Sequence, residues 1–226
     1  MKRIVYFIFL ISIISNAQIQ EIGIGGGSAT LISDIGRDDY FIPDGYFGAF
    51  VYRSNTNAWL SFLFRFTYSQ MEENDALSTS LGRRKRNWRS SMKVYDISLK
   101  LEYNFLPLNP YRIPHKIWVT PYLAVGLGAY VSFLTIIPGN NDPDSHAENA
   151  AYLPMAFGLK FSFKNRMKII WEISPGYSFK DNMEGSYMVD SPVFPHSDTR
   201  GTDWMIHNGI YITFGWGKLP CYLNMF

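Results

Sequence analysis

Short segments in which polar and apolar residues alternate recur along the whole chain. The clearest spans Asp96 to Tyr103. Its apolar members Ile97, Leu99 and Leu101 share one face, because successive side chains of a strand point to opposite sides of the sheet. The apolar faces of these segments are large and aromatic, which suits lipid better than a packed core. The pattern predicts a closed sheet, since every backbone amide in hydrocarbon needs a partner.

Eight such segments predict an all-β fold, namely an eight-stranded antiparallel up-and-down transmembrane β-barrel. Long and short connections alternate, as expected when long loops lie outside the cell and short turns lie in the periplasm. The polar stretches 71–92 and 138–149 are predicted as external loops. The predicted strands are 20–31, 45–53, 59–70, 94–105, 118–133, 152–163, 168–179 and 203–216.

The first residues predict export to the bacterial outer membrane. Met1 to Arg3 are followed by an apolar run, Ile4 to Ile14, and by Ser15-Asn16-Ala17, which is the order of a secretory signal peptide. No later stretch is apolar over the ~20 residues that a helical span needs. We therefore expect a signal peptide over 1–17, a barrel over 18–217 and a periplasmic C-terminal tail over 218–226.

Composition narrows the classes of function. The net charge is only +2, which is not the charge of a nucleic-acid binder, and 17% of the residues are aromatic. The lone Cys221 cannot form an internal disulfide. The spacing of His, Cys, Asp and Glu resembles no metal site, so neither a metal nor a cofactor is predicted.

Five charged residues have the strand parity of the barrel interior. Eight strands leave a lumen just wide enough for side chains to fill it, so these charges are expected to pair there. A structural ion network is the favoured interpretation, because an isolated buried charge is costly. A catalytic or solute site is the alternative. The five residues are Arg65, Lys100, Glu102, Lys160 and Glu172.

No catalytic residue is predicted. A hydrolytic barrel needs a serine activated by a histidine that a third polar group orients. Of the four histidines, only His207 lies on a predicted strand with its side chain inward, and no serine motif accompanies it. A structural histidine is the favoured interpretation.

Two segments outside the predicted strands are candidate contact sites. A basic run in an external loop suits anionic lipid phosphate, lipopolysaccharide or a protein partner, although such a run can also be merely solvated. The tail carries apolar residues that could plug the barrel or dock a periplasmic partner, or form a disordered end. The basic residues are Arg83, Arg84, Lys85, Arg86 and Arg89, and the tail residues are Leu219, Tyr222, Leu223 and Phe226.

The mature start, Gln20–Thr30 followed by Asp34-Ile35-Gly36, resembles the opening of the PorG-type family of outer-membrane barrels. Further similar blocks follow in the family's order. These blocks are Ser98–Phe105, Pro121–Gly128, Pro154–Lys160 and Gly217–Tyr222. None of them carries a catalytic motif.

The resemblance implies a non-enzymatic component of the type IX secretion system, which anchors the periplasmic ring of the lipoprotein PorK and its partner PorN. Three other classes stay open from the residues alone. They are a small adhesin or porin-like barrel that binds ligands through external loops, a lipid-modifying outer-membrane enzyme, and a soluble calycin-like barrel.

Overall fold

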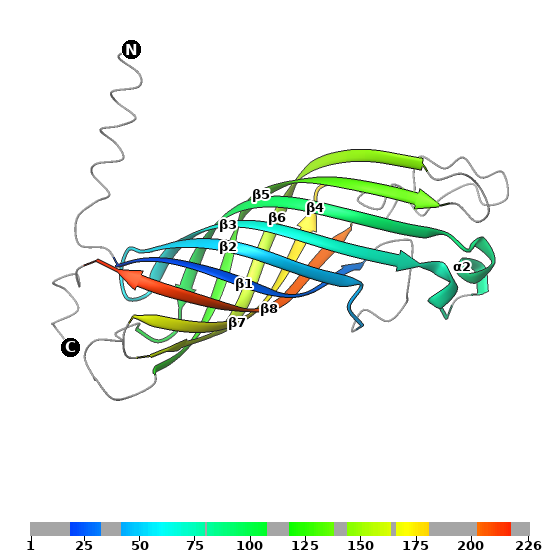
Figure 1. Ribbon diagram of the computed structural model, residues 1–226. Coiled ribbons are helices and arrows are strands. Elements are labelled where there is room, and N and C mark those ends of the chain that lie inside the picture. The colour runs from blue at the N-terminus through cyan, green and yellow to red at the C-terminus, as the bar shows by residue number, and fades with distance from the viewer. Residues whose placement is uncertain are drawn as a thin grey trace, which may run out of the picture.

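A closed barrel of eight antiparallel strands forms the fold (Figure 1). The computed structural model describes residues 19–32, 42–79, 81–107, 118–137, 144–163, 166–180 and 203–217. Each strand pairs with its neighbour in the chain, and β8 pairs with β1. The strands are β1 (Ile19–Ile32), β2 (Gly45–Asn55), β3 (Leu60–Asn74), β4 (Arg89–Asn104), β5 (Trp118–Ile137), β6 (Asp144–Ser162), β7 (Met167–Ser178) and β8 (Trp204–Trp216). The predicted fold class is confirmed. The predicted signal peptide and tail lie outside the described residues.

The two ends of the barrel differ. β1 begins and β8 ends at one end, which is periplasmic for an even strand number, and the short helices η1 (Asp75–Leu77) and α2 (Leu81–Arg86) lie at the outer end (Figure 1). Among the described residues, no helix is long and apolar enough to cross a membrane.

Two of the predicted external loops are shorter than expected. β3 continues to Asn74, β4 begins at Arg89, and β6 begins at Asp144, so the predictions of loops over 71–92 and 138–149 were partly wrong. The outward residues there, such as Glu72 and Ser91, are polar. The alternating pattern did not identify these residues as strand, because the strands continue beyond the hydrocarbon of the bilayer and their outward side chains there need not be apolar.

Local chemistry explains the tight turn between β2 and β3. The side-chain Oδ1 of Asn57 accepts hydrogen bonds from the backbone N–H groups of Trp59 at 2.8 Å and Leu60 at 2.7 Å. An asparagine that bonds the backbone two and three residues ahead forms a turn by itself. This turn sets the register in which Asn55 faces Ser61.

The paired register of β6 with β7 breaks between Pro154–Gly176 and Phe157–Ile173. Pro175 lies in this gap and has no N–H to donate to a ladder. At this point the hydroxyl of Ser174 donates to the backbone carbonyl of Met155 at 2.7 Å. The side chain thus takes the place of the missing backbone donor.

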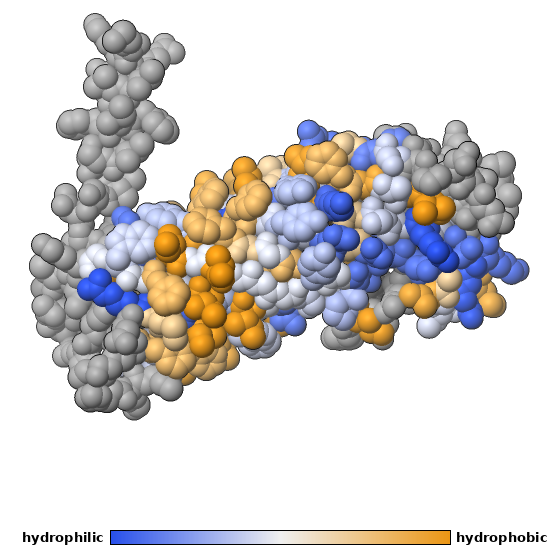
Figure 2. Space-filling view, in the orientation of Figure 1, coloured by the Kyte–Doolittle hydropathy of each residue, from blue (hydrophilic) through white to orange (hydrophobic). Residues whose placement is uncertain are grey.

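The outer surface carries a belt of exposed apolar side chains. Leu99, Leu127 and Ile24 are 65%, 68% and 69% exposed, although each lies in the middle of a strand. Figure 2 shows the apolar side chains over the barrel wall and hydrophilic ones gathered toward the α2 end. Rings flank the belt on both sides, as in membrane barrels. The outer girdle contains Tyr68, Tyr95, Phe133, Tyr177 and Trp204, and the periplasmic girdle contains Tyr52, Trp59, Tyr103, Phe105 and Trp216.

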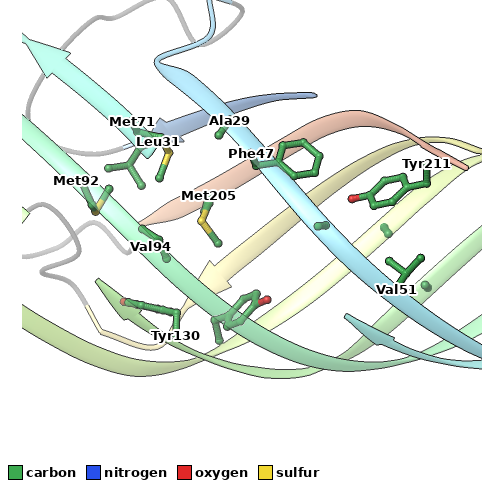
Figure 3. Packing of buried hydrophobic residues seen from close by; sticks show 14 of the residues in the cluster. Ala29, Leu31, Phe47, Val51, Met71, Met92, Val94, Tyr130, Met205 and Tyr211 are labelled. Carbon is green, nitrogen blue, oxygen red and sulfur yellow. The ribbon is translucent and has the colours of Figure 1, made fainter. Parts of the chain in front are cut away.

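The interior is divided along its length. Near the outer end it is packed with apolar side chains, among them Leu31, Met71, Met92 and Met205, which Figure 3 shows converging from different strands. Toward the periplasmic end lie the buried charged residues, together with apolar side chains such as Leu63 and Ile170. The sequence pattern did not predict the apolar part near the outer end.

Candidate functional site

All five charged residues predicted for the lumen are buried inside the barrel. Arg65 comes from β3, Lys100 and Glu102 from β4, Lys160 from β6 and Glu172 from β7. Four strands therefore deliver these charges to one space. The structure divides them between two ion clusters.

The periplasmic cluster joins three cations to two carboxylates. Arg53 Nη1 lies 3.1 Å from Glu21 Oε2, and Arg53 Nε donates to Glu102. Lys160 Nζ lies 3.0 Å from the other oxygen of Glu102, while Lys168 pairs with Glu21. Each carboxylate is thus held between two cations, which offsets the cost of burying it.

The central cluster surrounds Glu172. Arg65 donates to this carboxylate, and the hydroxyl of Tyr122 donates to its other oxygen. Lys100 Nζ lies 3.8 Å away from it and donates to Ser174 Oγ at 2.9 Å. Glu172 therefore neutralises two cations and fixes a tyrosine across the lumen.

Aromatic rings connect and cover the two clusters. Lys160 Nζ of the periplasmic cluster lies 4.3 Å from the ring centroid of Tyr122, whose hydroxyl reaches the central cluster. The guanidinium of Arg65 lies 4.8 Å from the ring centroid of Tyr211. Both distances suit a cation over an aromatic face. The charges and rings form a single packed layer across the barrel.

Sequence reasoning missed further charged residues of the interior, among them Glu21, Arg53, Asp96 and Lys168. Arg53 and Lys168 stood at the ends of predicted strands, where a charge is usually solvated, and Glu21 stood near the start of the first one. Asp96, which accepts from Tyr152 at 2.6 Å, opened the clearest alternating segment and was still not identified. Strand parity alone could have found all four, because each is inward and buried.

His207 lies inside the barrel, as its strand parity predicted. Its Nε2 lies 2.9 Å from Ser69 Oγ, and its ring lies 4.7 Å from that of Phe47. A serine and a histidine thus meet, but within the described ranges no carboxylate makes a hydrogen bond with the imidazole. Both side chains are also buried.

Of the two predicted contact segments, the structure describes the basic run but not the C-terminal tail. The basic run of residues 83–86 lies on α2 rather than in an irregular loop, and the side chains of Arg84 and Lys85 are exposed. Arg89 is the first residue of β4 and is also exposed. The four apolar tail residues, Leu219, Tyr222, Leu223 and Phe226, lie outside the described residues. No group of His, Cys, Asp and Glu in the described ranges could hold a metal ion.

We expect the purified barrel to conduct no ions. Large side chains such as Arg53, Tyr122, Lys160 and Leu63 are fully buried in the interior, which an eight-stranded barrel makes just wide enough for them. In a planar bilayer, the protein should show no steady single-channel steps, while a large porin in the same preparation does. Stable, voltage-independent steps would contradict a filled interior.

Comparisons with known proteins agree with this architecture. A family model described as "Domain of unknown function (DUF6089)" matches residues 2–225. No curated protein sequence matches the chain. The structure is similar to that of a major outer membrane protein from Thermus thermophilus, with a TM-score of 0.52 and 12% identity over 89% of this chain and 100% of that chain. It is also similar to Ail, the attachment invasion locus protein of Yersinia pestis, with a TM-score of 0.50 and 13% identity over 88% of this chain and 99% of that chain.

At these identities the likenesses show a shared barrel fold. The closed sheet, the apolar belt and the two aromatic girdles place the barrel in a membrane, because a soluble protein would expose that belt to water. The chain is an outer-membrane β-barrel protein, and a soluble calycin-like barrel is excluded by the outward aromatic faces.

Proposed function

This chain belongs to the DUF6089 family, and from its filled barrel we propose that it is a non-enzymatic anchor for the PorK/PorN-like periplasmic ring of the type IX protein secretion system. The observation that carries the proposal is the packed layer of two ion clusters across the lumen. A barrel without a passage contributes to secretion as a fixed point in the membrane.

Two further observations support this role. The resemblance to the PorG-type family extends over blocks from the mature start to Gly217–Tyr222, so it is not confined to one strand. The ion pairs tie β1, β2, β4, β6 and β7 together near the periplasmic end. A rigid periplasmic end suits an attachment point for a large assembly.

Affinity purification tests the anchor. The tagged protein is purified from detergent-solubilised native envelopes, and co-purifying proteins are identified by mass spectrometry. We expect the ring lipoprotein and its partner to be recovered, and we expect serine at Leu219, Tyr222, Leu223 and Phe226 to reduce that recovery. A tagged outer-membrane barrel of similar size from the same cells is the control. A folded barrel recovered without ring proteins, or a ring that assembles normally in a deletion strain, would refute the proposal.

A second candidate is a barrel that binds ligands from outside the cell. The observation in its favour is the height of β3 to β6, which continue beyond the outer girdle as a polar-faced sheet. If a strain that lacks this protein lost the binding of an external ligand to the cell surface but kept an intact periplasmic ring, this candidate would be favoured over the anchor.

A further inference from the structure

The outer face of β3 to β6 changes character in successive rows. The register places Phe66, Ile97, Ala129 and Ala151 side by side on neighbouring strands, and the next row outward contains Tyr68, Tyr95, Val131 and Asn149. Two residues farther out, Lys93 lies between Gln70 and Phe133. Beyond it come Glu72, Ser91 and Thr135, then Asn74, Arg89 and Ile137. The rows pass from hydrocarbon through the girdle to a polar surface.

The first two rows contain an apolar groove. Ala129 and Ala151 are outward neighbours on β5 and β6, where other rows of the belt have larger side chains such as Leu127 and Leu153. The two small side chains leave a groove of about 540 Å³ that Phe66, Tyr95 and Ile97 also line. It opens on the membrane side of the barrel at the level of the outer girdle. An acyl chain is the apolar group that surrounds a barrel at that depth.

The last two rows contain a polar pocket. It has a volume of about 520 Å³, and its walls include the side chains of Glu72, Asn74, Arg89, Ser91 and Thr135. Carboxylate, amide and hydroxyl groups accept or donate hydrogen bonds to the hydroxyls of a sugar, and the guanidinium adds a charged donor. The pocket also has an apolar wall at Leu77 and Ile137, which suits the apolar face of a sugar ring.

Lys93 lies between the groove and the pocket. It is four residues from Ile97 and two from Tyr95 along β4, which is about 14 Å and about 7 Å at the rise of a strand. Its ammonium is exposed, and within the described ranges no carboxylate forms an ion pair with Lys93 or Arg89. A cation in the outermost row of the girdle, beside Phe133, faces the layer where lipid phosphates lie.

We propose that this face of β3 to β6 binds one phosphoglycolipid of the outer leaflet, with an acyl chain in the groove, the phosphate at Lys93 and a sugar in the polar pocket. The apolar groove, the cation and the hydroxyl-binding pocket lie in one column, so a lipid that carries an acyl chain, a phosphate and a sugar contacts all three. The site faces the bilayer rather than the lumen, so it is independent of ring anchoring.

Native mass spectrometry of the full chain tests the site. The detergent-solubilised protein is mixed with micelles of monophosphoryl lipid A or of phosphatidylglycerol, and bound lipids are counted. We expect one lipid A per barrel, retained about tenfold more strongly than phosphatidylglycerol. Ala129→Phe fills the groove and Lys93→Gln removes the cation, so each should lower retention of lipid A about tenfold.

Matched variants separate the site from general contact with lipid. Gly48 is also outward, and a side chain added there meets open space, so Gly48→Phe adds the same ring elsewhere on the belt. Lys180 is an exposed lysine at the outer end whose Nζ lies 3.7 Å from Glu148, and Lys180→Gln is the control for charge. Both controls should retain lipid A as the original chain does. Equal retention by all variants, or no preference for the sugar-bearing lipid, would overturn the proposal. Because neither result changes the recovery of ring proteins, this failure is distinguishable from failure of the anchor.

Discussion

Glu172→Gln should lower the free energy of unfolding of the barrel by about 3–5 kcal/mol, the usual cost of removing one partner of a buried ion pair. The substitution keeps the shape of the side chain but removes the carboxylate with which both Arg65 and Lys100 form ion pairs. It also removes the negative charge from the group that accepts a hydrogen bond from the Tyr122 hydroxyl. Urea unfolding in detergent, followed by the mobility difference between folded and unfolded barrel on a gel, measures the effect.

Two further variants test whether the loss of stability in Glu172→Gln comes from its buried ion pair. Glu72→Gln removes an exposed carboxylate of the same chemistry and should change the free energy of unfolding by less than about 0.5 kcal/mol. Arg65→Met combined with Glu172→Gln removes both charges of the main pair, so it should recover much of the lost stability. If Glu172→Gln alone were as stable as the original chain, the central cluster would not hold the interior together.

Gly25→Ala should destabilise the barrel by about 1–3 kcal/mol, the range for overpacking a well-packed interior. Gly25 faces Tyr211 across the pairing of β1 with β8, and an added Cβ would lie 2.1 Å from Cδ1 of that ring. The ring has little freedom to move, because the guanidinium of Arg65 lies on it. Thermal unfolding monitored by circular dichroism would report the loss.

Shortening Tyr211, the residue that the added methyl group would contact, tests whether this contact causes the loss of stability. Tyr211→Leu combined with Gly25→Ala should be more stable than Gly25→Ala alone, because the shorter side chain leaves room for the methyl group. Gly48→Ala, where the added Cβ has open space, should be close to neutral. Equal destabilisation at Gly25 and Gly48 would attribute the effect to strand propensity rather than to the ring.

Strand order and parity could be predicted from the sequence because each strand in a bilayer has one face in lipid. Leu153, Phe157 and Phe161 alternate with inward residues over the whole belt, and β6 follows that pattern. The alternation of apolar and inward residues ends where the strand leaves the hydrocarbon of the bilayer. Residues 145–149 of β6 continue the strand through and beyond the outer girdle with small or polar outward side chains, so nothing in the alternation marked them.

The interior was harder to predict than the outer surface. Parity placed Arg65 and Glu172 in the lumen, but it could not say that they form one pair, since that depends on how strands β3 and β7 face each other across a closed barrel. The apolar outer part of the lumen was missed for a related reason. Met71 and Met92 came from stretches that had been predicted as loop, so their inward direction was not considered.

The apolar packing near the outer end gives the barrel an electrical asymmetry. Met71, Met92 and Leu134 are register neighbours on β3, β4 and β5, farther toward the outer end than Arg65 and Lys100 of the central cluster. A layer of low permittivity strengthens the ion pairs behind it, because water and salt cannot screen them from that side. We therefore expect the ion clusters to respond less to the salt concentration outside the cell than they would in a water-filled lumen.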